Sequence, residues 1–255
     1  MKPSNHNRMA TIGFAAAFAF GFAVVISSTR AAAPAEIYIV GALHGLHEQE
    51  ASFTYDDLGR LIAAIKPDVM LLEVTPEELA GKLETKGRPE YPKVIWPRLV
   101  DGGPIAIAME LGQPEYGEVT SAATKDFETF KKERPAEHQA LTIYGKGAEA
   151  VLLEHWKSVA DVHAEATDAL ARARAALNAA LVPGSASGQN RWDGAMVDAV
   201  RKAIDLHPGT RILVLGSYRN RFMFVKALRD SPGAKLIDMK PWLEANGFGA
   251  EKQRH

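Results

Sequence analysis

The sequence predicts an α/β fold: a mixed, largely parallel central sheet built from two βαβ-like halves, with a long helical insertion. Three observations lead to this prediction. Short apolar, β-branched runs recur near the beginning and the end of the chain, as buried strands do. Segments with apolar residues three or four positions apart separate these runs, as helices do. A helix-forming middle part, rich in Ala, Leu and Glu, joins the two halves.

The first half of the chain has the order strand, helix, strand, strand. Residues 36–40 (EIYIV) form an apolar run that ends at Gly41, and residues 68–74 (DVMLLEV) form a second run. Between them, residues 55–65 place Leu and Ile at helical spacing. This unit predicts parallel strands joined by a right-handed crossover. Residues 104–110 (PIAIAME) predict a third strand, because the turn signal DGG precedes them.

The middle of the chain is predicted to be a helical insertion over about residues 118–182. Residues 124–133 are polar, which favours a surface helix. Residues 148–181 contain no Gly or Pro and carry apolar residues at helical spacing, so one long helix or a helical hairpin is expected. The sequence VPGSASGQ at 182–189 predicts a loop. The simplest role for this insertion is a cap or arm; the alternative is a hydrophobic groove or an oligomerisation surface.

The second half echoes the first, with a strand, a Gly-x-x motif, a helix and a strand. The sequence predicts a helix, a strand, a helix and a last strand at residues 191–204, 211–216, 221–228 and 234–239. A single α/β domain is therefore expected over residues 36–245. Residues 246–255 are expected to form a loose tail.

Residues 1–35 are expected to be a signal peptide or an N-terminal anchor. The charged residues of this segment are Lys2, Arg8 and Arg30, and 21 uncharged residues lie between the two arginines. A basic start, an apolar stretch and small residues are typical of a secretory signal, and the sequence APA at 33–35 fits its cleavage site. This interpretation predicts a periplasmic or secreted protein. An uncleaved segment would instead anchor it in the inner membrane.

Composition excludes several classes of function. Lys plus Arg number 30 and Asp plus Glu 31, so no excess of positive charge favours nucleic-acid binding. The chain has no Cys, which excludes disulfides, thiolate nucleophiles and iron–sulfur clusters. The motifs G-x-S-x-G, G-x-x-x-x-G-K-[ST] and H-E-x-x-H are absent from the sequence. The expected partner is a small molecule or a peptide, with membrane contact only if the N-terminal segment stays uncleaved.

Three candidate functional residues follow or end the predicted strands of the first half. His44 comes directly after the first strand, Glu73 lies within the second, and Glu110 ends the third. Ligands bind beyond the carboxyl ends of strands in open parallel sheets. A buried carboxylate needs a cation, a metal or hydrogen-bond donors. One imidazole and two carboxylates would suit a divalent ion such as manganese or zinc, so these three residues are the predicted metal ligands.

Each of these residues also has a purely structural interpretation. His44 would then cap or pack the end of its strand, and Glu73 would form an ion pair with an Arg. His47 lies three residues after His44, but the segment around it favours a loop, where helical spacing does not apply. We expect His47 to line the same cleft, where it would contact the substrate.

Four segments of the chain, taken in order, resemble motifs of the TraB/TIKI/ChaN-like superfamily, which includes erythromycin esterase-like proteins. They are GALH, DVMLLEV, NRWDGAMVDAV and RILVLGSYRNRFMFVKAL. The resemblance covers residues from about 36 to 230. It implies two βαβ-like halves that face one cleft. Some members look like metal-dependent peptidases, and others look like haem-binding lipoproteins or esterases. The activity implied is hydrolysis of a peptide or ester bond, with or without a metal.

The resemblance also implies roles for single residues. His44 and Glu73 match two motif positions, where they would hold a metal or act as base and orienting group. Arg191 and Asp193 match a pair at the start of a helix. Asp193 is therefore the third candidate catalytic residue, and Arg191 is a candidate substrate-binding residue.

Position 219 departs from the family, because the chain has Arg219 where the family has His. Arg cannot ligate a metal, but it can bind a carboxylate or phosphate, or replace a metal's charge beside Glu73. The alternative function is thus a non-catalytic pseudoenzyme, or a protein that binds a small anion or haem on the same scaffold. Haem binding of the ChaN type needs a Tyr ligand. Neither Tyr55 nor Tyr218 matches that position, so haem is not expected.

Overall fold

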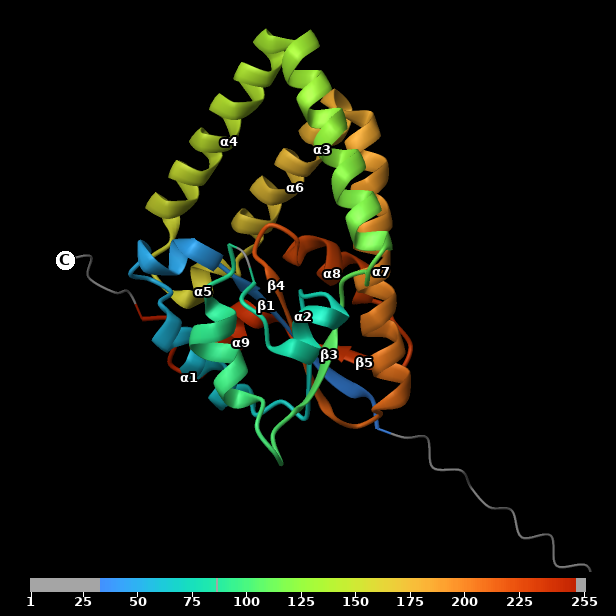
Figure 1. Cartoon of the computed structure of the whole chain (residues 1–255). Helices are drawn as coiled ribbons and strands as arrows, with labels where there is room; N and C mark the ends of the chain where they lie inside the picture. Colours follow the sequence, from blue (N-terminus) through green and yellow to red (C-terminus); the bar gives the residue numbers. More distant parts are fainter. Residues whose placement is uncertain (1–32, 86, 251–255) are drawn as a thin grey trace, which may run out of the picture. The chain divides into compact units, whose positions relative to one another are not determined.

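The part of the chain that the structure describes is a parallel sheet with helices on both faces (Figure 1). The structure is a computed structural model, and it describes residues 33–85 and 87–250. The strand order of the sheet is β3-β2-β4-β1-β5, and every pairing is parallel. The predicted α/β class is confirmed. The strands are β1 (Ala35–Ala42), β2 (Val69–Leu72), β3 (Ile105–Ala108), β4 (Arg211–Ser217) and β5 (Ala234–Leu236).

The two halves of the chain meet at β4. This strand pairs with β1 from Glu36↔Arg211 to Ala42↔Ser217, and with β2 on its other side. The two strands of the first βαβ unit are therefore not direct neighbours, because β4 lies between them. Both β1 and β4 are nearly continuous apolar runs, as is usual for strands in the interior of a parallel sheet. All the carboxyl ends still lie at one edge of the sheet.

Side chains of β1 alternate between the two faces of the sheet and so contribute to two cores. Tyr38 and Val40 belong to the core that includes the apolar residues of α1 (Tyr55–Ile65). Ile37 and Ile39 belong to the core that includes residues of α7 (Pro183–Leu206) and α8 (Arg221–Leu228). Both faces are thus covered, which removes the apolar strands from water.

Helices α1 and α8 begin and end where the sequence predicts. In α1, Thr54 and Asp57 form a capping box, in which each side chain accepts from the other residue's backbone N–H. The remaining helices are α2 (Pro76–Gly81), α3 (Glu115–Glu133), α4 (Pro135–His155), α5 (Val159–Val162), α6 (Glu165–Leu181) and α9 (Met239–Ala245). Short helical turns cover His44–Glu48 (η1), Tyr91–Ile95 (η2) and Trp96–Arg98 (η3).

The long helices α3, α4, α6 and α7 extend beyond the sheet and are called the arm here (Figure 1). The predicted surface helix at 124–133 is the second half of α3. The helix or hairpin predicted over 148–181 is divided among α4, α5 and α6. The break occurs where Ser158 caps α5 by accepting from the backbone N–H of Asp161.

The loop predicted at 182–189 is wrong, because α7 begins at Pro183 and continues through this segment. Pro is favourable in the first turn of a helix, where its missing N–H would have no partner. A Cβ at Gly184 would meet the carboxylate of Asp126 on α3. The glycines of this segment lie inside a helix that packs on α3, although Gly and Ser in this pattern usually indicate a turn.

Both ends of the described domain are held in the fold by backbone hydrogen bonds. Phe248 is buried, donates its N–H to the carbonyl of Leu243 and accepts from Ala160, so residues 246–250 are not a loose tail. Ala35, next to the predicted cleavage site, is the first residue of β1 and donates its N–H to Gly233. The predicted signal peptide lies outside the described residues except for its last three positions. Within the described residues, no helix combines the length and apolarity needed to span a bilayer.

Candidate functional site

The carboxyl edge of the sheet collects polar side chains from the ends of four strands. His44 follows β1, Glu73 follows β2, Glu110 follows β3 and Arg219 follows β4. The sequence predicted this placement, and parallel strands explain it. These side chains nevertheless form separate groups. No hydrogen bond or ion pair joins the described side chains of His44 and Glu73, which β4 separates.

Glu73 is a buried acceptor that ties three segments together. Its Oε2 accepts from the backbone N–H of Ser217 at the end of β4. Its Oε1 accepts from the guanidinium of Arg88 at 3.3 Å and from Asn220 at 3.5 Å. The Arg88 guanidinium also donates to the main-chain carbonyl of Glu73. A carboxylate with this many donors is satisfied inside the fold, as a buried charge must be.

Arg88 joins Glu73 to Glu110. Its guanidinium donates to Glu110 Oε1 at 2.7 Å, while Glu110 Oε2 has no hydrogen-bond partner among the described residues. Burial raises the pKa of Glu110 to about 7, although Arg88 lowers it. Burial lowers the pKa of Arg88, but the charges of Glu73 and Glu110 outweigh this effect and raise it overall. The three groups form a buried acid–guanidinium–acid cluster, which we call the Arg88 cluster.

The predicted metal ligands do not converge on a metal position in this arrangement. Glu73 and Glu110 both face the guanidinium of Arg88, and His44 faces a different carboxylate, Glu90. In the part of the chain that the structure describes, no group of three or more His, Cys, Asp or Glu side chains has the geometry to hold a metal. The carboxylates of Glu73 and Glu110 thus fit the cation that Arg88 supplies better than they fit manganese or zinc.

His44 forms a dyad with Glu90. Its Nδ1 lies 2.6 Å from Glu90 Oε1, and the Glu90 side chain is fully buried whereas the His44 ring is 19% exposed. With Glu90 ionised, Nδ1–H donates to the carboxylate and Nε2 remains available as an acceptor. His44 has a φ of 53°, in the left-handed region, where the chain turns after β1.

Residues 88–91 supply the partners of both groups, and sequence reasoning missed them. Arg88 reaches Glu73 and Glu110, while Glu90 reaches His44. Tyr91, which begins η2, is fully buried near both groups. Burial raises the pKa of Tyr91 well above its ordinary value, and the charges of Glu73, Glu90 and Glu110 add to this rise. The available signal was indirect: an acid within the apolar run of 68–74 requires a basic partner elsewhere in the chain.

Both ring nitrogens of His47, the predicted substrate contact, are used in hydrogen bonds inside the fold. Nδ1 donates to the carbonyl of Phe53 at 2.6 Å, and Nε2 accepts from the backbone N–H of Leu43 at 2.9 Å. His163, which was not predicted as a site residue, makes the same kind of bridge. Its Nδ1 donates to the carbonyl of Val159, and its Nε2 accepts from the backbone N–H of Gly41. Burial lowers the pKa of His47 and lowers that of His163 to about 3. Both are neutral structural bridges at the end of β1.

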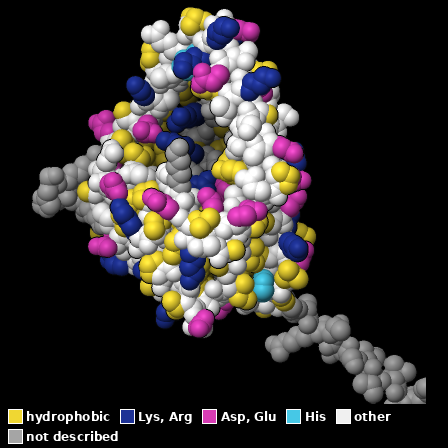
Figure 2. Space-filling view, viewed as in Figure 1, with side chains coloured by type: hydrophobic (Ala, Val, Ile, Leu, Met, Phe, Trp, Pro, Cys, Tyr) yellow, Lys and Arg dark blue, Asp and Glu magenta, His cyan; other side chains and the backbone are white. Residues whose placement is uncertain are grey.

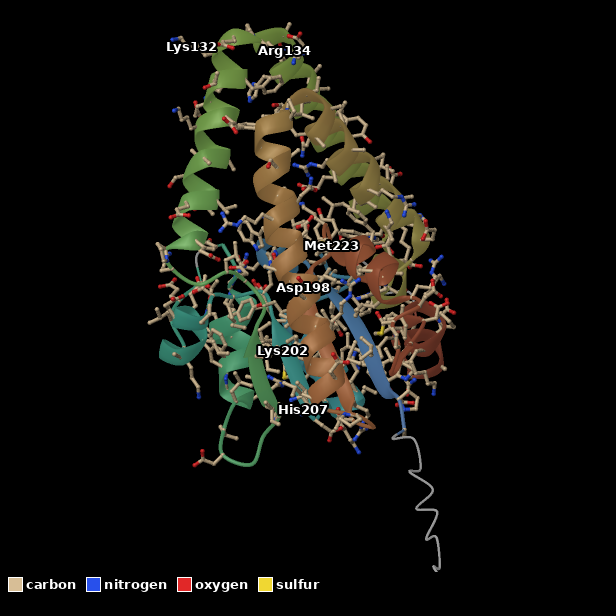
Figure 3. All side chains as sticks on the ribbon, turned by 90° about the vertical axis from the view of Figure 1, so that its right-hand side faces the viewer. Lys132, Arg134, Asp198, Lys202, His207 and Met223 are labelled. Atoms are coloured by element: carbon tan, nitrogen blue, oxygen red, sulfur yellow. The ribbon has the colours of Figure 1, made fainter. Side chains whose placement is uncertain are left out.

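A cavity of about 510 Å³ lies where the arm meets the carboxyl edge of the sheet. Figure 2 shows a hollow between the arm helices with Lys and Arg side chains around it. Met223 on α8 is part of its wall and lies at the base of the arm in Figure 3, whereas Lys132 and Arg134 mark the far end. The remaining lining residues that matter here are Arg172 and Arg174 of α6, Asp193 of α7, and Arg219 and Asn220 before α8. We call this space the arm cavity.

The predicted residues Asp193 and Arg219 both line the arm cavity, but Arg191 does not. Burial raises the pKa of Asp193, which accepts from the side chain of Gln189 at 2.7 Å. Arg191 is exposed and lies 3.4 Å from Glu115, so nothing directs it toward the cavity. The resemblance pairs Arg191 and Asp193, but in the structure Asp193 lies on the cavity wall and Arg191 lies on the outer surface of α7.

Arg219 points away from Glu73, so it does not replace a metal's charge there. Its guanidinium donates to Glu149 of α4 at 2.7 Å and to the hydroxyl of Tyr218 at 3.1 Å. Arg172 makes a comparable exposed pair with Glu165 at 2.8 Å. Arg174, which also lines the cavity, makes no ion pair or hydrogen bond with any described side chain. The described lining therefore includes three guanidinium groups, and that of Arg174 has no ion-pair or hydrogen-bond partner among the described residues.

The comparisons with known proteins leave the family open. Neither a protein-family model, nor a curated protein, nor a solved structure matches this chain. The resemblance to the TraB/TIKI/ChaN-like superfamily thus stays a prediction from the four sequence segments, and the α/β fold described above is what the structure establishes.

Proposed function

We propose that this protein binds a small organic anion in the arm cavity. The observation that carries the proposal is Arg174, a guanidinium on the wall of a cavity of about 510 Å³ with no anionic partner among the described residues. Arg172 and Arg219 also line this cavity, and Asp193 is the one acidic side chain among its described lining residues. A planar guanidinium binds a carboxylate or phosphate with two parallel hydrogen bonds.

The size and polarity of the cavity support a small-molecule ligand. Pockets of roughly 300–1,000 Å³, mainly apolar with a few oriented polar groups, are typical of small-molecule sites. The arm cavity combines Ala and Phe side chains with its arginines and with the amides of Asn220 and Gln189. Such a wall would bury the apolar part of a ligand and orient its charged end.

The Arg88 cluster supports binding over metal-assisted hydrolysis. In the metal-dependent interpretation, Glu73 and Glu110 would be open to a cation from solution. Here the guanidinium of Arg88 already neutralises both carboxylates within the fold. This arrangement agrees with a pseudoenzyme of TraB/TIKI-like ancestry, and the expected export of the chain would place such a binding protein in the periplasm or outside the cell.

The test measures binding of benzoate, benzyl alcohol and benzylamine to the full chain by calorimetry. Benzoate is expected to bind at least about tenfold more tightly than the other two, since a hydrogen bond to a charged group contributes about 1.5–3 kcal/mol. Arg174→Gln should remove this preference. Arg201→Gln is the matched control, because Arg201 is an exposed residue of α7 outside the cavity lining. Equal binding of the three probes, or equal losses in the two variants, would refute the proposal.

Hydrolysis of a peptide or ester bond is a second candidate, and the His44–Glu90 dyad is the observation in its favour. A carboxylate that holds Nδ1–H leaves Nε2 available to take a proton from water, which is the role of a general base. The test is hydrolysis of p-nitrophenyl acetate and of a mixed peptide library. His44→Gln and Glu90→Gln should abolish the activity, while His155→Gln, on the exposed end of α4, should leave it unchanged. Activity that survives His44→Gln would exclude this candidate.

A further inference from the structure

We infer that the ligand of the arm cavity is an anionic single-chain amphiphile, with its head group at Arg174 and its apolar tail directed toward the far end of the arm. This inference rests on the proposed function and names the class of ligand. It follows from how charge and size are distributed along the helices that line the cavity.

The direction of α6 relative to the sheet is fixed at both of its ends. Near its start, Asp168 lies 3.0 Å from Arg221 of α8, at the carboxyl edge of the sheet. At its end, the carbonyl of Leu181 accepts from Arg134, which lies at the α3–α4 turn at the far end of the arm (Figure 3). Successive cavity residues of α6 therefore lie progressively farther from the sheet.

Charged side chains of the lining are confined to the half of the cavity nearer the sheet. On α6 they are Arg172 and Arg174, and the loop after β4 contributes Arg219. On α7, which runs back toward the sheet, Asp193 lies ten residues after the start of the helix. A negatively charged head group would find its partners here, where the exposed pair of Arg219 with Glu149 can exchange partners at little cost.

Among the described residues, no charged side chain lines the outer half of the cavity. It consists of small and apolar residues from three helices with two short polar ones: Phe127, Ala175, Ala176, Asn178, Ala179, Val182, Ser185 and Ala186. From Arg174 to Val182 the helix rises about 12 Å, at 1.5 Å per residue. The small alanine side chains leave room for a ligand chain along this part of the cavity wall, and each methylene of the ligand that leaves water there favours binding.

The experiment compares butyrate, dodecanoate, dodecyl phosphate and dodecyltrimethylammonium, below micelle-forming concentrations, by calorimetry on the full chain. Dodecanoate should bind at least about tenfold more tightly than butyrate, and dodecyltrimethylammonium should bind more weakly than either dodecyl anion. The comparison of carboxylate with phosphate identifies the preferred head group.

Two neighbouring positions of α6 provide a matched pair of variants. Both positions are exposed, but Ala179 lines the cavity and Ala180 does not, so Ala179→Trp would place its ring in the cavity and Ala180→Trp would place the same ring outside it. We expect Ala179→Trp to remove the advantage of dodecanoate over butyrate and leave butyrate binding unchanged, and Ala180→Trp to change neither.

The outcomes separate this inference from the proposed function. Butyrate and benzoate binding that depends on Arg174, without any gain from the longer chain, would overturn the amphiphile and leave the anion site intact. Tight binding of dodecyltrimethylammonium, or equal effects of the two Trp variants, would also overturn it. Absence of binding by every anion would refute both proposals.

Discussion

The guanidinium of Arg88 lies 2.7 Å from the carboxylate of Glu110, and the two side chains are 14% and 0% exposed. This pair shows how the fold satisfies acids at its carboxyl edge: a residue from an irregular segment reaches two strand ends at once. Its removal would leave two buried carboxylates without their cation, which is far more costly than loss of a surface pair.

Arg88→Met should lower the free energy of unfolding by about 3–5 kcal/mol, since the buried side chains of Glu73 and Glu110 would lose the guanidinium that they share. Urea unfolding followed by circular dichroism measures this loss. Arg191→Met, which removes an exposed pair with Glu115, should change the value by less than about 0.5 kcal/mol. A loss below about 1 kcal/mol for Arg88→Met would show that the cluster is not a buried ion-pair network.

Dialysis against a chelator should leave the thermal unfolding midpoint unchanged. The reason is that the cation between Glu73 and Glu110 belongs to Arg88 and cannot be removed. Elemental analysis of protein purified without added metal or chelator provides the second measurement. A stoichiometric metal, together with a midpoint that falls by several degrees on chelation, would contradict the proposed arrangement and restore the predicted metal ligands.

His163 should make the protein less stable in acid. Burial lowers its pKa from 6.5 to about 3, and the charge of Arg221 and the nearby His47 act in the same direction. The unfolded chain therefore binds the proton more readily, so this contribution to stability is complete above pH 6.5 and is lost as the pH falls toward 3. Urea unfolding of wild type and His163→Gln between pH 4 and 8 should show a shallower acid slope for the variant.

Asp168 should change the pH dependence of stability in the opposite direction to His163, over an overlapping pH range. Burial raises its pKa to about 6 despite the facing Arg221, with smaller effects of Glu165 and Arg172. Its contribution to stability is thus greatest below the ordinary pKa of 3.8 and is lost as the pH rises through 6. In the same urea series, Asp168→Asn should steepen the acid loss relative to wild type, and a shallower slope would refute this assignment.

Gly41→Ala should destabilise the fold by about 1–3 kcal/mol, the usual cost of overpacking. A Cβ at Gly41 would lie 2.7 Å from the Cα of Tyr218, a backbone atom that cannot move without shifting β4. Gly45→Ala is the control, because nothing lies within 4 Å of a Cβ there. Thermal unfolding of both variants checks the difference, and equal midpoints would contradict the close contact between the ends of β1 and β4.

Local patterns were sufficient for the elements that carry their own signal. The apolar runs at 36–40 and 211–216 predicted buried strands, and helical spacing predicted α1, because burial of an amphipathic face imposes its period on the sequence. The same logic placed His44, Glu73 and Glu110 at the carboxyl edge, since the residue after a strand must emerge there. The loop predicted at 182–189 is wrong, because the glycines of this segment lie inside α7, which packs on α3, and do not form a turn.

What the sequence by itself determined is thus the α/β class and the edge of the sheet where polar groups gather. The tertiary structure decided which groups meet: β4 inserts between β1 and β2, Arg88 neutralises Glu73 and Glu110, and Glu90 holds His44. It also turned Arg219 toward Glu149 and left Arg174 facing the arm cavity. Ion pairing between segments depends on distances in space, which leave no periodic trace in the chain, and only the folded arrangement fixes them.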